Sequence, residues 1–231
     1  YQYNLQIVNI AVPSSPLAVA TFNLGGNAEE VLVDGNYVYV ASGTRGVSVI
    51  DITDIENPVL STRAATSNAT SLALALRYNL LLVGSGIRSN GGWSVDISEP
   101  TLPSVIGHYT TQGWSLGLHY GYGYLFIADG TLGVSSIGSF QIFQLYPSGA
   151  FLPVASDSLS ASVQDVSVCQ NFAYIVTWDN ISTSELVAYE IHDPQNPLKV
   201  HTQTLESSKA IDTREDGLIG IVGRAGLYLF Y

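Results

Sequence analysis

Short runs of alternating apolar and polar residues fill this chain, and turn residues separate them at regular intervals. The clearest unit runs from Val31 to Leu60, with the sequence VLVDGNYVYVASGTRGVSVIDITDIENPVL. Alternation bounded by Gly, Asn and Asp predicts β-strands joined by tight turns. The unit therefore predicts three strands and the start of a fourth. No amphipathic helix of convincing length is expected elsewhere in the chain.

Weaker copies of this unit recur along the chain. The proline that opens the fourth strand returns with spacings of 42, 45, 50 and 44 residues, at Pro16, Pro58, Pro103, Pro153 and Pro197. Five hairpins align on an Asn or Gly at the end of the turn: Asn36, Asn79, Gly123, Asn171 and Gly217. These residue types tolerate the positive φ that a short hairpin needs. A period near 45 residues indicates a repeat architecture.

The second strand of each copy is apolar on both faces, as in Leu80-Leu81-Leu82-Val83 and Tyr174-Ile175-Val176. Strands of this kind are covered on both faces. Small antiparallel sheets that are covered on both sides and repeat in this way are typical of a β-propeller. We therefore expect an all-β fold, a five-bladed β-propeller of four-stranded antiparallel blades. Residues 1–231 are expected to form a single domain.

The order of strands predicts how the ring closes. The chain begins with strands of the third and fourth type and ends with strands of the first to third type. Leu17 to Leu24 is thus expected to be the fourth strand of the last blade, so that pairing of the N- and C-terminal strands closes the ring.

The strand from Leu5 to Ile10 then has no place, because Leu227 to Tyr231 already fills the position of the third strand. Residues 1–16 form an arm or edge strand, continue from upstream sequence, or add to another subunit's sheet. The candidates for an intersubunit strand are Leu5, Ile7, Val8 and Ile10.

The segment from Gly46 to Asp54, followed by Glu56-Asn57-Pro58, resembles the LVIVD-repeat proteins. Their repeat has a hydrophobic pair, Asp, Ile, Ser or Thr and Asp ahead of Asn-Pro. Residues 94–100 and 191–197 are weaker copies, whereas residues 140–153 lack the aspartate and the Asn-Pro. The resemblance implies a propeller that is typically exported or on the cell surface. It supplies no catalytic residues.

Composition excludes several classes of protein. A net charge of -11 disfavours binding to nucleic acid. No apolar run reaches the length of a transmembrane helix. The single cysteine, Cys169, excludes an internal disulfide framework and is expected to be a buried small hydrophobe within a strand. The chain lacks Met and starts at Tyr1, so we expect a processed chain or part of a longer one.

Two sequons for N-linked glycans, Asn68-Ala69-Thr70 and Asn180-Ile181-Ser182, fall in predicted loops. A chain this rich in Ser and Thr contains such sequons by chance, so only their position is informative. Together with the acidic composition, Asn68 and Asn180 lead us to expect a secreted or cell-surface protein.

Motifs for chemistry are few. Residues 113–117 match G-x-S-x-G but lead into a hairpin, where a nucleophile elbow needs a helix. The histidines lack paired metal-ligand spacing, although His119 lies on an innermost strand. We therefore predict no catalytic residue, cofactor or metal. Polar residues gather at the channel end of the inner strands: Glu29, Glu30, Gln164, Asp165 and Lys209. Three tryptophans lie near loops: Trp93, Trp114 and Trp178.

These observations favour a non-enzymatic structural or interaction propeller of the cell surface or extracellular matrix. It is expected to be a subunit of a larger assembly, with copies of itself as partner and a filament as one form. One alternative is a hydrolase or lyase that uses acidic residues at the propeller channel. Another is a lectin-like or peptide-binding module centred on the loop tryptophans.

Overall fold

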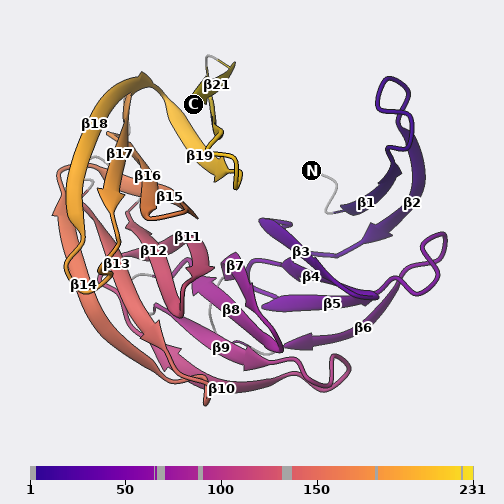
Figure 1. The fold of residues 1–231 in the computed structure, drawn as a ribbon. Coiled ribbons are helices and arrows are strands. Elements are labelled where there is room, and N and C mark those ends of the chain that lie inside the picture. The colour runs from indigo at the N-terminus through magenta and orange to yellow at the C-terminus, as the bar shows by residue number, and fades with distance from the viewer. Residues whose placement is uncertain are drawn as a thin grey trace.

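The computed structural model describes residues 4–64, 66, 71–87, 91–131, 137–179, 182–224 and 226–230. The described residues form 21 strands and no helix. The strands build six antiparallel sheets, of which four have four strands, one has three and one has two. The sheets stand around a common axis like the blades of a propeller (Figure 1). The prediction of an all-β, five-bladed propeller is confirmed, with three strands instead of four in the last blade.

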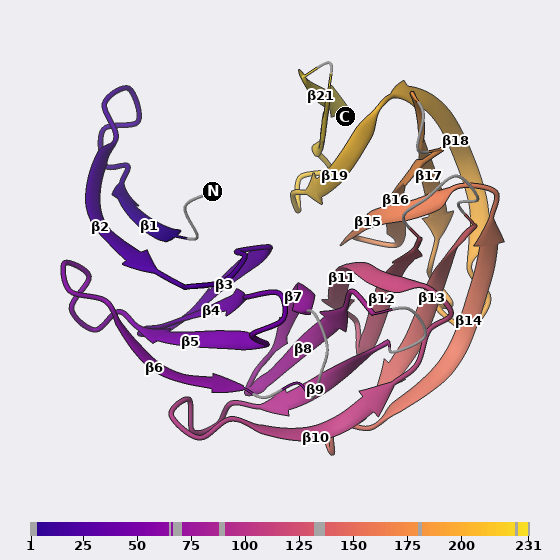
Figure 2. The same cartoon turned by 180° about the vertical axis from the view of Figure 1, so that it is seen from behind.

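Four blades are complete, and their strands follow one another from the axis outward (Figures 1 and 2). Blade 1 contains β3 (Glu30–Asp34), β4 (Tyr37–Ala41), β5 (Val47–Asp51) and β6 (Val59–Ala64). Blade 2 contains β7 (Ser71–Arg77), β8 (Leu80–Ser85), β9 (Gly92–Asp96) and β10 (Ser104–Tyr109). Blade 3 contains β11 (Trp114–Gly121), β12 (Tyr124–Gly130), β13 (Gly138–Leu145) and β14 (Phe151–Leu159). Blade 4 contains β15 (Ser162–Cys169), β16 (Phe172–Trp178), β17 (Thr183–Glu190) and β18 (Leu198–Glu206).

Among the described residues, two sheets have fewer than four strands. Blade 5 contains β19 (Ser208–Thr213), β20 (Ile219–Gly223) and β21 (Gly226–Phe230). The N-terminal sheet contains only β1 (Asn4–Asn9) and β2 (Leu17–Asn23).

The N-terminal sheet is the outer half of a further blade. In every complete blade the pairing of the third and fourth strands skips one residue of the fourth strand, at Ser61, Ile106, Val154 or Val200. The pairing of β1 with β2 skips Val19 in the same way. The shared β-bulge identifies β1 and β2 as strands of the third and fourth type, as the sequence pattern indicated.

The predicted closure of the ring is wrong. Strand β2 pairs with β1 instead of β21, and both views show the N-terminal sheet and blade 5 standing apart (Figures 1 and 2). The short turn between β1 and β2 brings these strands together at a small entropic cost, whereas β2 and β21 lie at opposite ends of the chain. Leu5 and Phe22 then pack against Val38, Val40 and Ile50 of blade 1.

The core lies between the blades. Leu81 of β8 packs with Tyr39 and Val49 of blade 1, whereas its neighbour Leu82 packs with Ile127 of blade 3. Alternate residues of one strand thus enter two different hydrophobic clusters. This arrangement explains why the second strands are apolar at nearly every position.

The hairpin turns differ from the prediction in one detail. Gly123 and Gly217 have positive φ, as expected. In the other three hairpins the left-handed residue is the one before the predicted Asn: Gly35, Tyr78 and Gln170. The carbonyl groups of Asn36, Asn79 and Asn171 instead accept hydrogen bonds from Ile52, Ile97 and Ile191, which follow the third strands. The Asn that recurs in these turns therefore anchors the end of the third strand.

Replacing Tyr78 with glycine should raise the free energy of unfolding by about 0.5–1 kcal/mol, because glycine adopts left-handed φ without the strain of a side chain. Tyr78 has φ of 48° and is 84% exposed, so little packing is lost. Urea unfolding followed by tryptophan fluorescence measures the change.

Gly35→Ala is the matched control, since Gly35 has φ of 54° and open space where its Cβ would stand. This substitution should lower the free energy of unfolding by about 1 kcal/mol. Two variants that unfold at the wild-type urea concentration would contradict the left-handed backbone at this turn position.

Candidate functional site

Two acidic side chains occupy the same repeat position at the inner ends of blades 1 and 4. Glu30 Oε2 accepts a hydrogen bond of 2.6 Å from the backbone N–H of Leu74 in blade 2. Asp165 Oδ2 accepts one of 2.9 Å from the backbone N–H of Ile211 in blade 5. Each carboxylate therefore joins the innermost strand of its own blade to that of the next blade.

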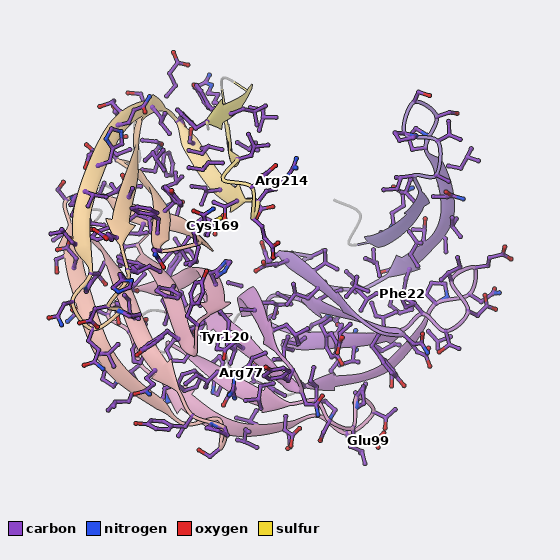
Figure 3. All side chains as sticks on the ribbon, viewed as in Figure 1. Phe22, Arg77, Glu99, Tyr120, Cys169 and Arg214 are labelled. Atoms are coloured by element: carbon purple, nitrogen blue, oxygen red, sulfur yellow. The ribbon has the colours of Figure 1, made fainter. Side chains whose placement is uncertain are left out.

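Other polar contacts reinforce the innermost strands. Arg77 Nε in blade 2 donates to the Tyr120 hydroxyl in blade 3 at 2.8 Å, and the two residues belong to the innermost strands β7 and β11 (Figure 3). A Cβ on Gly117 of blade 3 would collide with Asp165, so glycine at this position lets blades 3 and 4 approach. The axis is thus lined by side chains that hold the blades in register.

A cavity of about 450 Å³ opens among these strands. Its polar lining includes Glu30, His119, Asp165 and Asp212, and its apolar lining includes Leu32, Leu74, Leu76 and Leu118. Burial raises the pKa of Glu30 to about 7 and that of Asp165 to about 6. Burial also lowers the pKa of His119, against the opposing effect of Asp212. The cavity therefore favours neutral forms of all three groups.

Only two of the five predicted channel residues line the cavity. Glu30 and Asp165 line the cavity, whereas Glu29 is exposed outside it. Gln164 is buried and donates to Ser162 Oγ at 2.7 Å. Lys209 Nζ lies 4.3 Å from the centre of the Trp178 ring.

Asp212 belongs to the cavity lining but was missed in the sequence. The signal that could have found it is its place near the end of an innermost strand, the strand type that also carries His119. In the part of the chain that the structure describes, no group of three or more His, Cys, Asp or Glu residues suits a metal ion.

The three tryptophans do not form a common surface. Trp93 is 5% exposed and packs in the core with its ring 5.7 Å from that of His108. Trp114 and Trp178 are half-buried and belong to blades 3 and 4. The aromatic positions that suggested a binding module are therefore distributed over three blades.

The G-x-S-x-G segment is part of a strand. Ser115 lies in β11 with no exposed surface, and its hydroxyl donates to the Gly91 carbonyl at 3.0 Å.

The expectation that Cys169 is buried within a strand is partly wrong, because Cys169 is the last residue of β15 and only half-buried. Its Sγ donates to the Arg214 carbonyl at 3.0 Å, at the inner ends of blades 4 and 5 (Figure 3). Asn68 and Asn180 lie outside the described residues.

The two open ends expose apolar side chains on blade faces that are covered elsewhere. On blade 1, Val31 and Val33 of β3 are exposed, while their cross-strand partners Val40 and Val38 are buried. The N-terminal sheet therefore covers only the outer half of this face.

On blade 5, Ile219 and Ile221 pack toward blade 4, whereas Val222, Leu227 and Leu229 are exposed. Because side chains alternate along a strand, these three lie on the face that points away from blade 4. Exposed apolar surfaces of this kind mark interaction sites.

The predicted intersubunit strand lies at the first of these ends. Leu5 packs against blade 1 and Ile7 is half-buried. Val8 and Ile10 are exposed. These four residues thus remain candidates for contact with another subunit.

Glu30→Gln should flatten the dependence of stability on pH. The pKa of Glu30 is raised from 4.5 to about 7 in the folded protein, so the folded state binds more protons between these values. The free energy of unfolding therefore falls as the pH rises from about 5 to 8. Glutamine keeps an oxygen acceptor for the Leu74 N–H and cannot ionise.

The variant should gain up to about 3 kcal/mol relative to wild type between pH 5 and pH 8, an upper bound because Glu30 is not completely buried. Urea unfolding at both pH values measures the gain. Glu29→Gln is the matched control, since Glu29 is the exposed neighbour and should leave the profile unchanged. An equal pH dependence in wild type and Glu30→Gln would contradict the assignment.

Comparison with known proteins agrees with this fold. The LVIVD repeat model matches residues 25–80, 90–111 and 160–183, which lie in blades 1, 2 and 4 and their margins. No curated protein matches the sequence significantly. Within the described residues there is no helix of the length and hydropathy needed to cross a membrane.

Several solved structures share the arrangement at low sequence identity. The β-propeller domain of Cps50 (Swd1) from Myceliophteria thermophila is 11% identical with a TM-score of 0.72, over 99% of this chain and 77% of that one. A chain of the COPII outer coat vertex on membranes is 10% identical with a TM-score of 0.74, over 99% and 64%. The computationally designed Ika8 protein is 8% identical with a TM-score of 0.60, over 93% and 74%.

At such identities these likenesses concern the fold alone, and the repeat match is the more specific finding. The sequence segment that suggested the family, Gly46 to Asp54, falls within the first matched range. The chain carries LVIVD repeats on a β-propeller, and the predicted resemblance is confirmed.

Proposed function

We propose that this chain is a non-enzymatic structural and interaction propeller of the cell surface or extracellular matrix, and that it assembles with copies of itself through its open ends. The observation that carries the proposal is the pair of uncovered apolar blade faces, Val31 and Val33 at one end and Val222, Leu227 and Leu229 at the other. Elsewhere in the propeller the corresponding faces are covered by a neighbouring blade.

The two ends differ in strand content, so a contact between them joins unlike surfaces. Contacts between unlike surfaces produce rings when the rotation closes and filaments when it does not. A single kind of contact would therefore suffice to build an extended structure from one protein. The acidic composition and the two sequons support an extracellular setting.

An enzymatic role finds less support at the axis. The two most perturbed carboxylates, Glu30 and Asp165, already accept backbone hydrogen bonds between blades. Their raised pKa values follow from burial at these structural contacts. The separation of the tryptophans likewise weakens the proposal of a lectin-like module.

We expect the purified chain to form larger species as its concentration rises from below to above the micromolar range. Association buries apolar surface but costs translational and rotational entropy, so assembly is favoured only at the higher concentrations. Sedimentation velocity measures the sizes, and negative-stain electron microscopy distinguishes filaments from closed rings.

Leu227→Ser should shift this transition to higher concentration, because Leu227 is 62% exposed on the open face of blade 5. Leu102→Ser is the matched control, since Leu102 is 76% exposed in the turn between β9 and β10 and should leave assembly unchanged. A wild-type chain that stays monomeric at every concentration would be inconsistent with self-assembly.

A further inference from the structure

Among the described residues, blade 5 has three strands and no outer one. In blades 1 to 4 the third strand pairs with a second strand on one side and a fourth strand on the other. Among the described residues, β21 pairs only with β20. One edge of β21 therefore presents backbone N–H and C=O groups without a neighbouring strand.

The glycines at the start of the third strands show that the space beside β21 is empty. A Cβ on Gly46, just before β5, would lie 2.6 Å from the carbonyl oxygen of Ala64, the last residue of the fourth strand. A Cβ on Gly91, just before β9, would collide with the carbonyl oxygen of Tyr109. Gly226 opens β21, and a Cβ there would meet nothing within 4 Å. The space that a fourth strand occupies in the other blades is therefore open beside β21 among the described residues.

The free edges at the two ends lack the usual protection against pairing. Natural proteins protect edge strands with charged residues or proline. The fourth strands of blades 1, 3 and 4 carry such residues: Arg63 in β6, Pro153 and Asp157 in β14, and Lys199 and Glu206 in β18. The fourth strand of blade 2, β10, contains His108. Strand β21 (GLYLF) and strand β2 (LAVATFN) contain no charged residue and no proline.

Strand β2 supplies the second unprotected edge. It pairs only with β1 within the described residues, so its outer edge is free. Figures 1 and 2 place β2 at the outer rim on one side of the gap and blade 5 on the other side. The two edges therefore lie on the two sides of the gap, where one copy can offer β21 and the next copy can offer β2.

We propose that the outer edge of β2 in one copy pairs antiparallel with the free edge of β21 in the next copy and completes blade 5 as its fourth strand. This inference rests on the proposed self-assembly and names the strands that carry it. The resulting sheet contains β19, β20, β21 and then β2 and β1 of the second copy. Since β2 and β21 are different strands, the contact runs head to tail and leaves one free β2 and one free β21 at the two ends of the assembly.

Two single substitutions test the pairing. Leu229→Lys places a charge on β21 at a side chain that is 60% exposed, and Thr21→Lys places one on β2 at an exposed position. A lysine on an edge strand opposes further pairing. Each variant alone is expected to remain monomeric in sedimentation velocity at concentrations at which wild type assembles.

A mixture of the two variants gives the decisive result. One intact junction remains, between β21 of the Thr21→Lys copy and β2 of the Leu229→Lys copy. The mixture is therefore expected to form a one-to-one dimer and no larger species. Leu198→Lys is the matched control, because Leu198 is also 60% exposed but lies on the fourth strand of complete blade 4. This control should assemble like wild type.

Cysteine cross-linking is an independent test, because it detects the strand pairing directly and does not rely on a substitution that prevents it. In a Cys169→Ser background, a Leu229→Cys protein mixed with a Thr21→Cys protein should form a disulfide-linked dimer under oxidation. Thr21 alternates with Phe22, which packs on blade 1, so the Thr21 side chain lies on the exposed face, as Leu229 does. Each protein alone should give far less cross-linked product.

The outcomes separate this inference from the proposed function. If both lysine variants assemble like wild type, or their mixture yields no dimer, the strand pairing is wrong while self-assembly stands. If wild type itself stays monomeric, both are wrong, and another chain or another segment fills the site beside β21.

Discussion

Every blade of this propeller depends on having both of its faces covered. Leu81 and Leu82 are adjacent in β8 and fully buried, yet they pack with different blades on opposite sides. A blade removed from its neighbours would expose two apolar faces at once, so no blade is stable by itself. The same dependence applies to the first and last sheets, each of which has one face without a neighbouring sheet among the described residues.

Polar contacts near the axis fix the position of each blade relative to the next, which the apolar packing alone does not. Glu30 and Asp165 each accept a backbone N–H from the next blade, and burial makes their ionised forms costly. Apolar faces tolerate small sliding movements, whereas a hydrogen bond of this kind has one geometry. The axial carboxylates therefore specify the relative position of the blades at a cost in stability near neutral pH.

The sequence was sufficient for most of the blades because their rules are local. Apolar runs at Leu80 to Val83 and Asn or Gly at the hairpins predicted strands and turns that the structure contains. The prediction put positive φ on the Asn of three turns, whereas the structure has it on the preceding residue, Gly35, Tyr78 or Gln170. The sequence could not decide this, because a two-residue turn can have positive φ at either central position. Asp212 was missed in the axial cavity, since only the ring arrangement brings it near Glu30 and Asp165.

Ring closure was beyond local rules. Strand β2 has the sequence and the bulge of a fourth strand, which are compatible both with β1 and with β21 as a partner. The structure has the partner that is nearer in sequence, and the cost is an open ring with five exposed apolar side chains on the blade faces at its ends: Val31, Val33, Val222, Leu227 and Leu229.

These exposed side chains also limit what holds copies together. Covering half-exposed Val and Leu side chains contributes roughly 1 kcal/mol each, so the five together contribute about 5 kcal/mol. That sum is comparable with the free energy lost when two molecules become one. Apolar contact alone therefore gives a weak and unspecific association. The backbone hydrogen bonds of a strand paired at β21 supply both the remaining affinity and the single geometry that a regular assembly requires.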